Sequence, residues 1–360
     1  MTTLRYLGWE GYADGDFAAA LRRDTSLDIA GDNHLSDDAA SRLVQQNPNS
    51  WDIININTPF VRAELYPRGL IRALPAAFDP YVRNLSEPFA RFEEPATGTD
   101  GNLIGVPQRC GPFNLVINEN RLSRALATEQ GFRLTLYRDF HGRFGILTYE
   151  DFNIMHIAIA AGLNPFQTFT DGDFISFSCA ARDIFQAAKL ISDDHNALNR
   201  ALVEGVIDFY ISGGTYTASP ARLAGHSEIR AVTPANGPIN GKGGVAFVEI
   251  NALIHRGEER RERQEAFLTY IASDEGAYAA SLAADACNPV VQMQRASVFE
   301  RFTRHQLDAM QWDDFEENMA RCADYAIMPD YAKLAIIMRA AVSSIDPKSD
   351  RNQPRIAKTN

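Results

Sequence analysis

The sequence predicts an α/β protein made of two doubly wound α/β lobes joined by a hinge. Apolar, strand-like runs alternate with amphipathic, helix-like segments, which is the pattern of a parallel sheet covered by helices. The chain has 360 residues, 45% of them hydrophobic, and this length favours two or three lobes over one. Long apolar strands near residues 113–118 and 245–251 would carry the chain from one lobe to the other.

The N-terminal third predicts the order strand–helix–strand–helix–strand. One helix would run to Arg23, a second from Ser36 to Gln46, and a third would begin at Pro59, since proline suits a first helical turn. The three strands are expected at Leu4–Trp9, Ser26–Ala30 and Trp51–Ile56. Ligands of such sheets bind beyond the carboxyl ends of the strands, which here read Trp9–Tyr12, Gly31–His34 and Asn55–Thr58.

The rest of the chain continues the alternation after an irregular stretch at residues 79–101. Thr148 and Asp151 have the spacing of a capping box, so a helix is expected to open there. Further strands are expected at 102–108, 113–118, 206–211, 229–232 and 245–255, the first two being separate strands joined by residues 109–112. Further helices are expected at 180–192, 195–204, 258–272, 274–284, 304–320 and 331–343.

These elements predict the division of the chain. We expect lobe 1 to comprise residues 1–114 and 246–300, and lobe 2 to comprise 115–245 and 301–346. The polar segment 347–360 is expected to be a flexible tail.

Charge and composition argue against several classes of protein. The net charge of −11 disfavours nucleic acid as a partner, because phosphate binding needs a basic face. No apolar run approaches the roughly 18 residues of a membrane span, so we expect no insertion into a membrane. The N-terminus enters a strand directly, which leaves a cytoplasmic protein or one whose leader has been removed. The four cysteines lie far apart without C-x-x-C, so they are expected to be buried thiols or one disulfide.

Motifs for catalysis or cofactor binding are missing from the sequence. The glycine-rich segments 212–215 and 236–244 lack the spacing of a phosphate loop, and neither G-x-S-x-G nor H-E-x-x-H occurs. Cys110 beside Arg109 could form a reactive thiolate, and Glu150 and Glu249 could form an acid–base pair. We expect no cofactor and no enzyme activity, but an enzyme or a ligand sensor on the same fold stays an alternative.

Several segments, taken in order along most of the chain, resemble the spermidine/putrescine-binding branch of the type II periplasmic solute-binding proteins that serve ABC importers. The first strand leads into Trp9 and Tyr12, and Trp51–Ile54 precedes a polar strand end. The other similar segments are Ile104–Gly111, Asn114–Asn118, Gly142–Glu150, Gly205–Gly225, Gly243–Leu253, Phe267–Ile271 and Asn288-Pro289. The resemblance implies a periplasmic monomer that closes two lobes over a small amine and delivers it to ABC permease subunits.

The resemblance also implies ligand-binding residues in the first lobe. Trp9 and Tyr12 fall on the aromatic pair that encloses the methylene chain of the ligand, where cation–π contact favours aromatic rings. Asn57 and Thr58 fall on the hydroxyl-bearing strand end. Glu249 and Phe247 match an aspartate and a tryptophan on the return strand, and a carboxylate in this apolar strand needs a ligand or a basic partner. These residues are the candidate contacts of lobe 1.

In the second lobe the resemblance implies that Glu150 pairs with an amine. Asn153 stands where the family has a second carboxylate. Ser212 lies near the position of a family tryptophan, but the spacing differs.

Arg109 replaces an apolar residue of the family, and a guanidinium at this point would suit a ligand carboxylate. The loss of one carboxylate and the gain of Arg109 therefore favour a zwitterion or monoamine, such as an amino-acid derivative, over a simple polyamine.

Overall fold

The computed structural model describes residues 3–13 and 15–345, and within it the chain divides into two units. Of the described residues, unit 1 contains those up to Cys110 and Phe247–Leu307, and unit 2 contains Gly111–Ala246 and 308–345. The first two of the three boundaries fall inside long strands, β4 (Val106–Asn118) and β9 (Gly244–Leu253). The expected tail at 347–360 lies outside the described residues.

The sheet of unit 1 has a parallel core. β1 (Leu4–Gly8) lies between β2 (Ile29–Asn33) and β3 (Ile53–Asn57), and all three run in the same direction. β9 joins β3 in antiparallel register, so that Glu249 lies opposite Asn57. The carboxyl ends of β1 and β3 and the middle of β9 therefore meet at one edge of this sheet.

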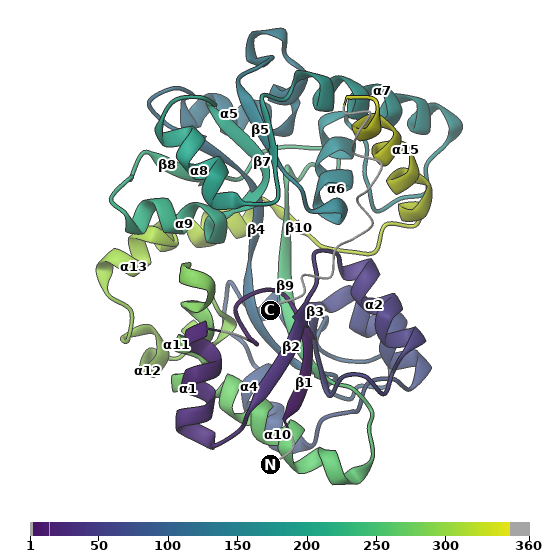
Figure 1. Ribbon diagram of the computed structural model, residues 1–360, viewed down its shortest axis with the longest axis vertical. Helices are drawn as coiled ribbons and strands as arrows, with labels where there is room; N and C mark the ends of the chain where they lie inside the picture. The colour runs from purple at the N-terminus through teal and green to yellow at the C-terminus, as the bar shows by residue number, and fades with distance from the viewer. Residues whose placement is uncertain (1–2, 14, 346–360) are drawn as a thin grey trace. The chain divides into compact units, whose positions relative to one another are not determined.

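Helices cover both faces of the sheet in unit 1, as expected for a doubly wound arrangement. In Figure 1, α1 and α11 lie together on one side of β1 and β2, and α2 lies on the other. The helices are α1 (Gly15–Thr25), α2 (Asp37–Gln46), α3 (Thr58–Phe60), α4 (Asp79–Val82), α10 (Glu258–Ala272), α11 (Asp274–Ser281) and α12 (Ala296–Phe299). A short helix, α13 (Arg304–Ala309), spans the last boundary between the units.

The sheet of unit 2 has the order β4, β7 (Phe209–Gly214), β5 (Phe144–Leu147), β6 (Leu190–Ser192). β5 runs parallel to both of its neighbours, whereas β4 is antiparallel to β7. Two further strands attach to this sheet: β8 (Ile229–Val232) pairs with β4, and β10 (Cys322–Asp324) pairs with the first residues of β9.

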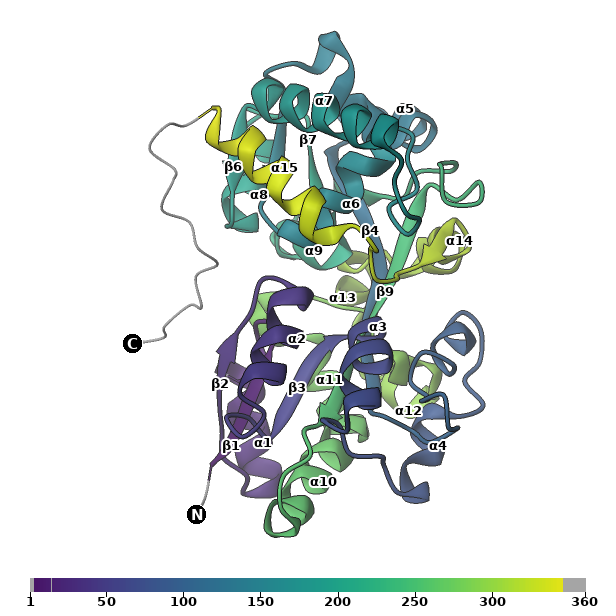
Figure 2. The same cartoon turned by 90° about the vertical axis from the view of Figure 1, so that its right-hand side faces the viewer.

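One helix, α6 (Glu150–Ala160), forms the centre of unit 2. Every residue of α6 after Glu150 is buried, because α7, α15 and the 3-10 segment Gly131–Leu136 all contact it. Figures 1 and 2 both show α15 lying along α7. The other helices are α5 (Arg124–Gln130), α7 (Asp171–Ala187), α8 (His195–Val203), α9 (Thr215–Leu223), α14 (Phe315–Ala320) and α15 (Tyr331–Ser343).

The predicted α/β fold class is confirmed, and so are local signals such as the start of α2. There the Ser36 hydroxyl accepts a hydrogen bond from the Ala39 amide at 3.2 Å, as an N-cap residue does. The expected division into two strands joined by residues 109–112 is wrong, because β4 is one continuous strand. Its backbone stays extended there since Arg109 bridges to Val290 and the Cys110 amide donates to Pro289.

The capping box expected at Thr148 is also wrong. The Thr148 amide donates to the Ser192 carbonyl and extends β5, and α6 begins after Tyr149. A capping box exists instead at Thr170 and Asp173, so that α7 begins at Asp171 and not at Ala180. Two other boundaries differ: β2 lies at 29–33 instead of 26–30, and the helix expected at 304–320 breaks at Gln311, whose φ is 55°.

Candidate functional site

Aromatic and charged side chains gather where the strands of unit 1 end. Trp9 and Tyr12 follow the carboxyl end of β1, and Glu249 lies on β9 opposite the end of β3. Arg109, on β4, contacts both Tyr12 and Glu249. We call Trp9, Tyr12, Arg109 and Glu249 the unit 1 cluster. The structure thus brings together four of the predicted site residues, two from the loop after β1 and one each from β4 and β9.

Arg109 is the centre of the unit 1 cluster. Its Nε donates to Glu249 Oε2 at 2.9 Å, and its Nη1 donates to the Glu10 carbonyl at 3.0 Å. The guanidinium carbon lies 4.2 Å from the centroid of the Tyr12 ring, in a cation–π contact. The Tyr12 hydroxyl donates to the same Oε2 atom at 3.3 Å. The aromatic face and the carboxylate are therefore both engaged by a guanidinium of the chain itself.

This ion pair is buried. Arg109 is 5% exposed and Glu249 is 7% exposed. Burial raises the pKa of Glu249, and the positive charge of Arg109 partly offsets that rise. Burial also opposes the charge of Arg109, but attraction to Glu249 outweighs it, so the pKa of Arg109 is raised. Since arginine stays protonated in proteins, the cluster carries one positive and one negative charge that balance.

Trp9 lies beside a buried histidine. The ring centroids of Trp9 and His34 are 4.5 Å apart, and the Trp9 amide donates to the Asn55 side chain at 3.4 Å. His34 Nε2 donates to the Asn55 carbonyl at 2.9 Å. Burial lowers the pKa of His34 to about 4, against the opposing effect of that hydrogen bond. A neutral imidazole therefore lies beside the indole ring, and the Asn55 side chain holds the backbone of Trp9.

The other predicted residues of unit 1 are buried near the same sheet edge. Asn57 donates from Nδ2 to Asp37 at 2.6 Å, so its amide helps to fix the start of α2. Thr58 is the first residue of α3. Phe247 is two residues before Glu249 on β9, which places both side chains on one face of the sheet.

Unit 2 contains a neutral polar group made of Asn153, His156 and Ser212, which we call the unit 2 cluster. The Ser212 hydroxyl donates to Asn153 Oδ1, and His156 Nδ1 lies 3.0 Å from the Ser212 hydroxyl. Because the hydroxyl proton is used by Asn153, this network assigns the imidazole proton to Nδ1. His156 stacks on Phe132 with centroids 4.1 Å apart. Burial lowers the pKa of His156 to about 3, so the imidazole is neutral.

Ser212 has an unusual backbone, with φ of 67°, at the point where β7 leads into α9. A serine in this region is held there by its surroundings. A serine, a histidine and a strained turn also occur in hydrolases, but His156 Nε2 has no hydrogen-bond partner among the described residues. The arrangement thus lacks the acid that orients the histidine of a catalytic triad.

Glu150 does not join the unit 2 cluster. Its two oxygens accept hydrogen bonds from Arg339 at 2.6 and 2.7 Å, and the Tyr331 hydroxyl donates to it at 2.7 Å. Both partners lie on α15. Glu150 and Asn153 are one helical turn apart, yet the first bonds to α15 and the second to β7. Both predicted amine-binding carboxylates, Glu150 and Glu249, are therefore paired with arginines of the chain.

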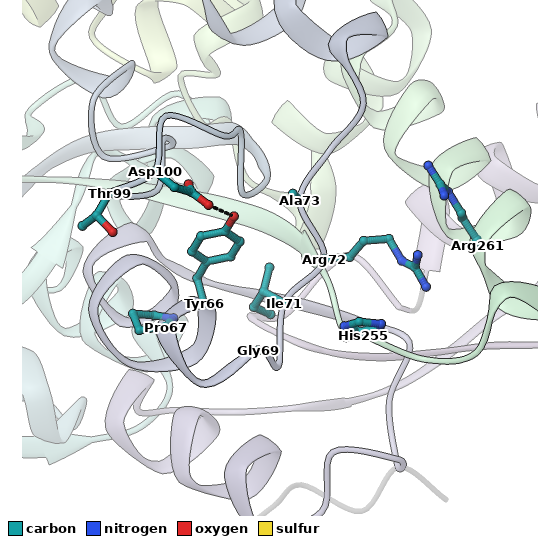
Figure 3. Close-up of a pocket in the computed structure, with 10 residues that line it drawn as sticks. All are labelled: Tyr66, Pro67, Gly69, Ile71, Arg72, Ala73, Thr99, Asp100, His255 and Arg261. Carbon is teal, nitrogen blue, oxygen red and sulfur yellow. Dashed lines mark hydrogen bonds between the residues drawn. The ribbon is translucent and has the colours of Figure 1, made fainter.

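A pocket of about 550 Å³ lies elsewhere on unit 1 (Figure 3). It adjoins Ile71 and His255, which lie by the amino end of β3 and not by its carboxyl end. Its charged groups are already paired: Arg72 with Glu258 at 2.7 Å, and Asp100 with the Tyr66 hydroxyl at 2.7 Å. None of the predicted site residues lines this pocket.

Within residues 3–13 and 15–345, no group of three or more histidine, cysteine or acidic side chains is placed to hold a metal ion. No helix in the same residues is both long enough and apolar enough to cross a membrane.

The candidate site residues do not include His34, Asn55 and His156, although the strand ends Gly31–His34 and Asn55–Thr58 contain the first two. His156 follows the candidate Asn153 by three residues, and residues three apart share one face of a helix. Asn55 likewise shares a strand face with Asn57. Their partners, Trp9 and Ser212, lie 46 and 56 residues away from Asn55 and His156, and no local spacing indicates contacts of that kind.

Many solved structures of transport proteins share this fold. The spermidine/putrescine ABC transporter substrate-binding protein PotD of Streptococcus pneumoniae is 13% identical, with a TM-score of 0.64 over 95% of this chain and 100% of that chain. MotA from A. tumefaciens B6, solved with glucopine, is 14% identical, with a TM-score of 0.61 over 96% and 99%. Iron-bound HitA from Pseudomonas aeruginosa is 14% identical, with a TM-score of 0.63 over 95% and 99%.

No protein-family model and no curated protein sequence matches the chain. The likeness is therefore one of fold, and it extends over nearly the whole length of both partners in each comparison. The ligands in these two structures differ: glucopine in MotA and iron in HitA. The chain has the two-lobe α/β fold of the substrate-binding proteins of ABC transporters.

Proposed function

We propose that the protein is the solute-binding component of an ABC importer. The observation that supports this most is the fold that 95% of the chain shares with a substrate-binding protein of an ABC transporter, PotD. The unit 1 cluster adds a second argument, because it places aromatic and charged groups at the strand ends where ligands of such sheets bind. The protein would work outside the cytoplasm as a monomer and would deliver its solute to permease subunits.

The proposed ligand is a small amine-bearing solute that also carries a carboxylate. Its contacts would come from the ten residues that the sequence indicated. Glu249 and Glu150 are each matched by an arginine, Arg109 and Arg339. A polyamine would need carboxylates at both ends, whereas a zwitterion can use arginine and carboxylate together. The pairing of both carboxylates therefore favours the zwitterion.

A thermal-shift panel followed by calorimetry tests the proposal. The panel contains putrescine, spermidine, γ-aminobutyrate, basic amino acids and amino-acid–sugar conjugates. A solute at 100 times its dissociation constant stabilises a protein by about 2.7 kcal/mol, which is a clear shift of the unfolding midpoint. We expect a zwitterionic amine to bind. If every solute leaves the midpoint unchanged, the proposal loses its support.

A pair of tyrosine variants controls for non-specific effects. Tyr12→Phe removes a hydroxyl that donates to Glu249 in the unit 1 cluster. Tyr66→Phe removes one that donates to Asp100 in the pocket of Figure 3. We expect Tyr12→Phe alone to weaken binding, by about tenfold for the loss of one hydrogen bond of roughly 1.4 kcal/mol. Mass spectrometry of the recovered solute separates capture from turnover: an unchanged solute supports transport, and a converted one supports the enzyme alternative.

A further inference from the structure

Recognition of an amine in a protein uses an aromatic face and a nearby carboxylate. The unit 1 cluster contains both, in the ring of Tyr12 and the carboxylate of Glu249. Their hydroxyl–carboxylate hydrogen bond, 3.3 Å long, holds them in one fixed arrangement. The cluster therefore has the parts of a cation site within a single unit.

The cation in this site belongs to the protein. The guanidinium of Arg109 lies over the Tyr12 ring at 4.2 Å and donates to Glu249 at 2.9 Å. A third contact, from Nη1 to the Glu10 carbonyl at 3.0 Å, orients the guanidinium. With Arg109 5% exposed and Glu249 7% exposed, water does little to screen the pair. A second cation here would meet the charge of Arg109 and would have no carboxylate of its own.

We propose that Arg109 is a built-in cation that determines specificity by occupying the place of an amine in the unit 1 cluster. This inference rests on the proposed function and narrows its ligand. The part of the solute that contacts the unit 1 cluster is therefore uncharged or anionic. Polyamines are excluded as ligands of the protein. Removal of the arginine side chain leaves a ring, a carboxylate and an empty volume, and so converts the cluster into an amine site.

The test is a gain of binding in Arg109→Ala. By calorimetry we expect the wild type to bind putrescine weakly or not at all, and Arg109→Ala to bind it at least tenfold more tightly. Ethylguanidine, whose atoms correspond to those removed beyond Cβ, should also bind Arg109→Ala and raise its unfolding midpoint. The double variant Arg109→Ala/Glu249→Gln should lose both effects, because the carboxylate is gone.

Arg260→Met is the matched control. Arg260 also pairs with a buried carboxylate of unit 1, Asp52, at 3.1 Å. No aromatic ring contact is recorded for this arginine among the described residues. Arg260→Met should therefore gain no affinity for putrescine. A gain in both variants would indicate a general effect of lost positive charge and would overturn the proposal.

Two further results overturn the inference and leave the proposed solute-binding role intact. One is tight binding of putrescine by the wild type, a measurement that does not depend on whether any variant folds. The other is a folded Arg109→Ala protein, verified by circular dichroism, that binds neither amine nor ethylguanidine. Conversely, a wild type that binds no solute of the panel contradicts the proposed function, while a gain of putrescine binding in Arg109→Ala would still support the built-in cation.

Discussion

The unit 1 and unit 2 clusters offset the cost of burying their polar side chains in different ways. In unit 1, Arg109 and Glu249 carry full charges that cancel each other at 2.9 Å. In unit 2, Asn153, Ser212 and His156 are neutral and form a chain of hydrogen bonds. A buried charge without its partner costs far more than a buried hydroxyl without its partner. Loss of one side chain should therefore be more damaging in unit 1 than in unit 2.

The largest effect is expected for Arg109→Met. This change leaves the buried carboxylate of Glu249 without its counter-charge, which typically costs about 3–5 kcal/mol of unfolding free energy. Chemical denaturation monitored by circular dichroism measures this cost. Replacement of both partners, in Arg109→Met/Glu249→Leu, should recover most of the loss, because no buried charge remains. If the double variant is as unstable as the single one, packing and not charge dominates the cluster.

Acid should affect both units through a buried histidine, His34 beside Trp9 of the unit 1 cluster and His156 of the unit 2 cluster. In the unfolded chain a histidine gains its proton near pH 6.5, whereas burial holds the pKa of His34 at about 4 and that of His156 at about 3. The unfolded state thus binds more protons below pH 6.5, and stability that is present above this pH is lost as the pH falls. Each histidine should lower the free energy of unfolding by roughly 1.4 kcal/mol for each pH unit of acidification, or by about 3 kcal/mol between pH 6.5 and 4.

Two variants separate the histidines in that titration. His34→Gln should remove the contribution that levels off near pH 4, and His156→Gln the one that continues toward pH 3. Urea unfolding at a series of pH values gives both slopes. Equal slopes for the wild type and both variants between pH 6.5 and 4 would mean that neither imidazole is held neutral.

Local sequence signals predicted most of the fold. The signals of Ser36 and of the apolar runs Leu4–Trp9 and Trp51–Ile56 depend on neighbours in the chain, and the corresponding elements exist with small shifts. The wrong predictions lie where a residue distant in the sequence determines the local structure. Residues 109–112 continue a strand because residues 289–290 pair with them, and Thr148 extends β5 because Ser192 accepts its amide hydrogen.

The site shows the same limit more strongly. The sequence predicts which residue types lie at the strand ends, and Arg109 departs from the resembled family, which has an apolar residue there. Its pairing with Glu249 spans 140 residues, and the bond between His156 and Ser212 spans 56. Which arginine neutralises which carboxylate depends on strand register, and spacing along the chain does not determine it.

A moderate effect is expected for Ser212→Ala in unit 2. The change leaves Asn153 Oδ1 and His156 Nδ1 without the hydroxyl that links them, a loss of about 1–3 kcal/mol. Denaturant unfolding compares it directly with Arg109→Met. A loss larger than that of Arg109→Met would reverse the comparison between the clusters and would place the more critical polar group in unit 2.

The smallest effect is expected for Glu150→Gln, which tests whether burial, and not charge alone, sets the cost in unit 1. Glu150 and Arg339 form an ion pair like that of Glu249 and Arg109, with N–O distances near 2.6 Å, but the Arg339 side chain is 57% exposed. Water can solvate a charge that loses its partner there, so the expected loss is about 0.2–1 kcal/mol. Denaturant unfolding in 0.1 and 1 M NaCl measures it, and added salt should reduce it further because it screens exposed charges. A loss as large as that of Arg109→Met would mean that these carboxylates depend on their arginines regardless of exposure, and the distinction between a buried built-in cation and an ordinary surface pair would fail.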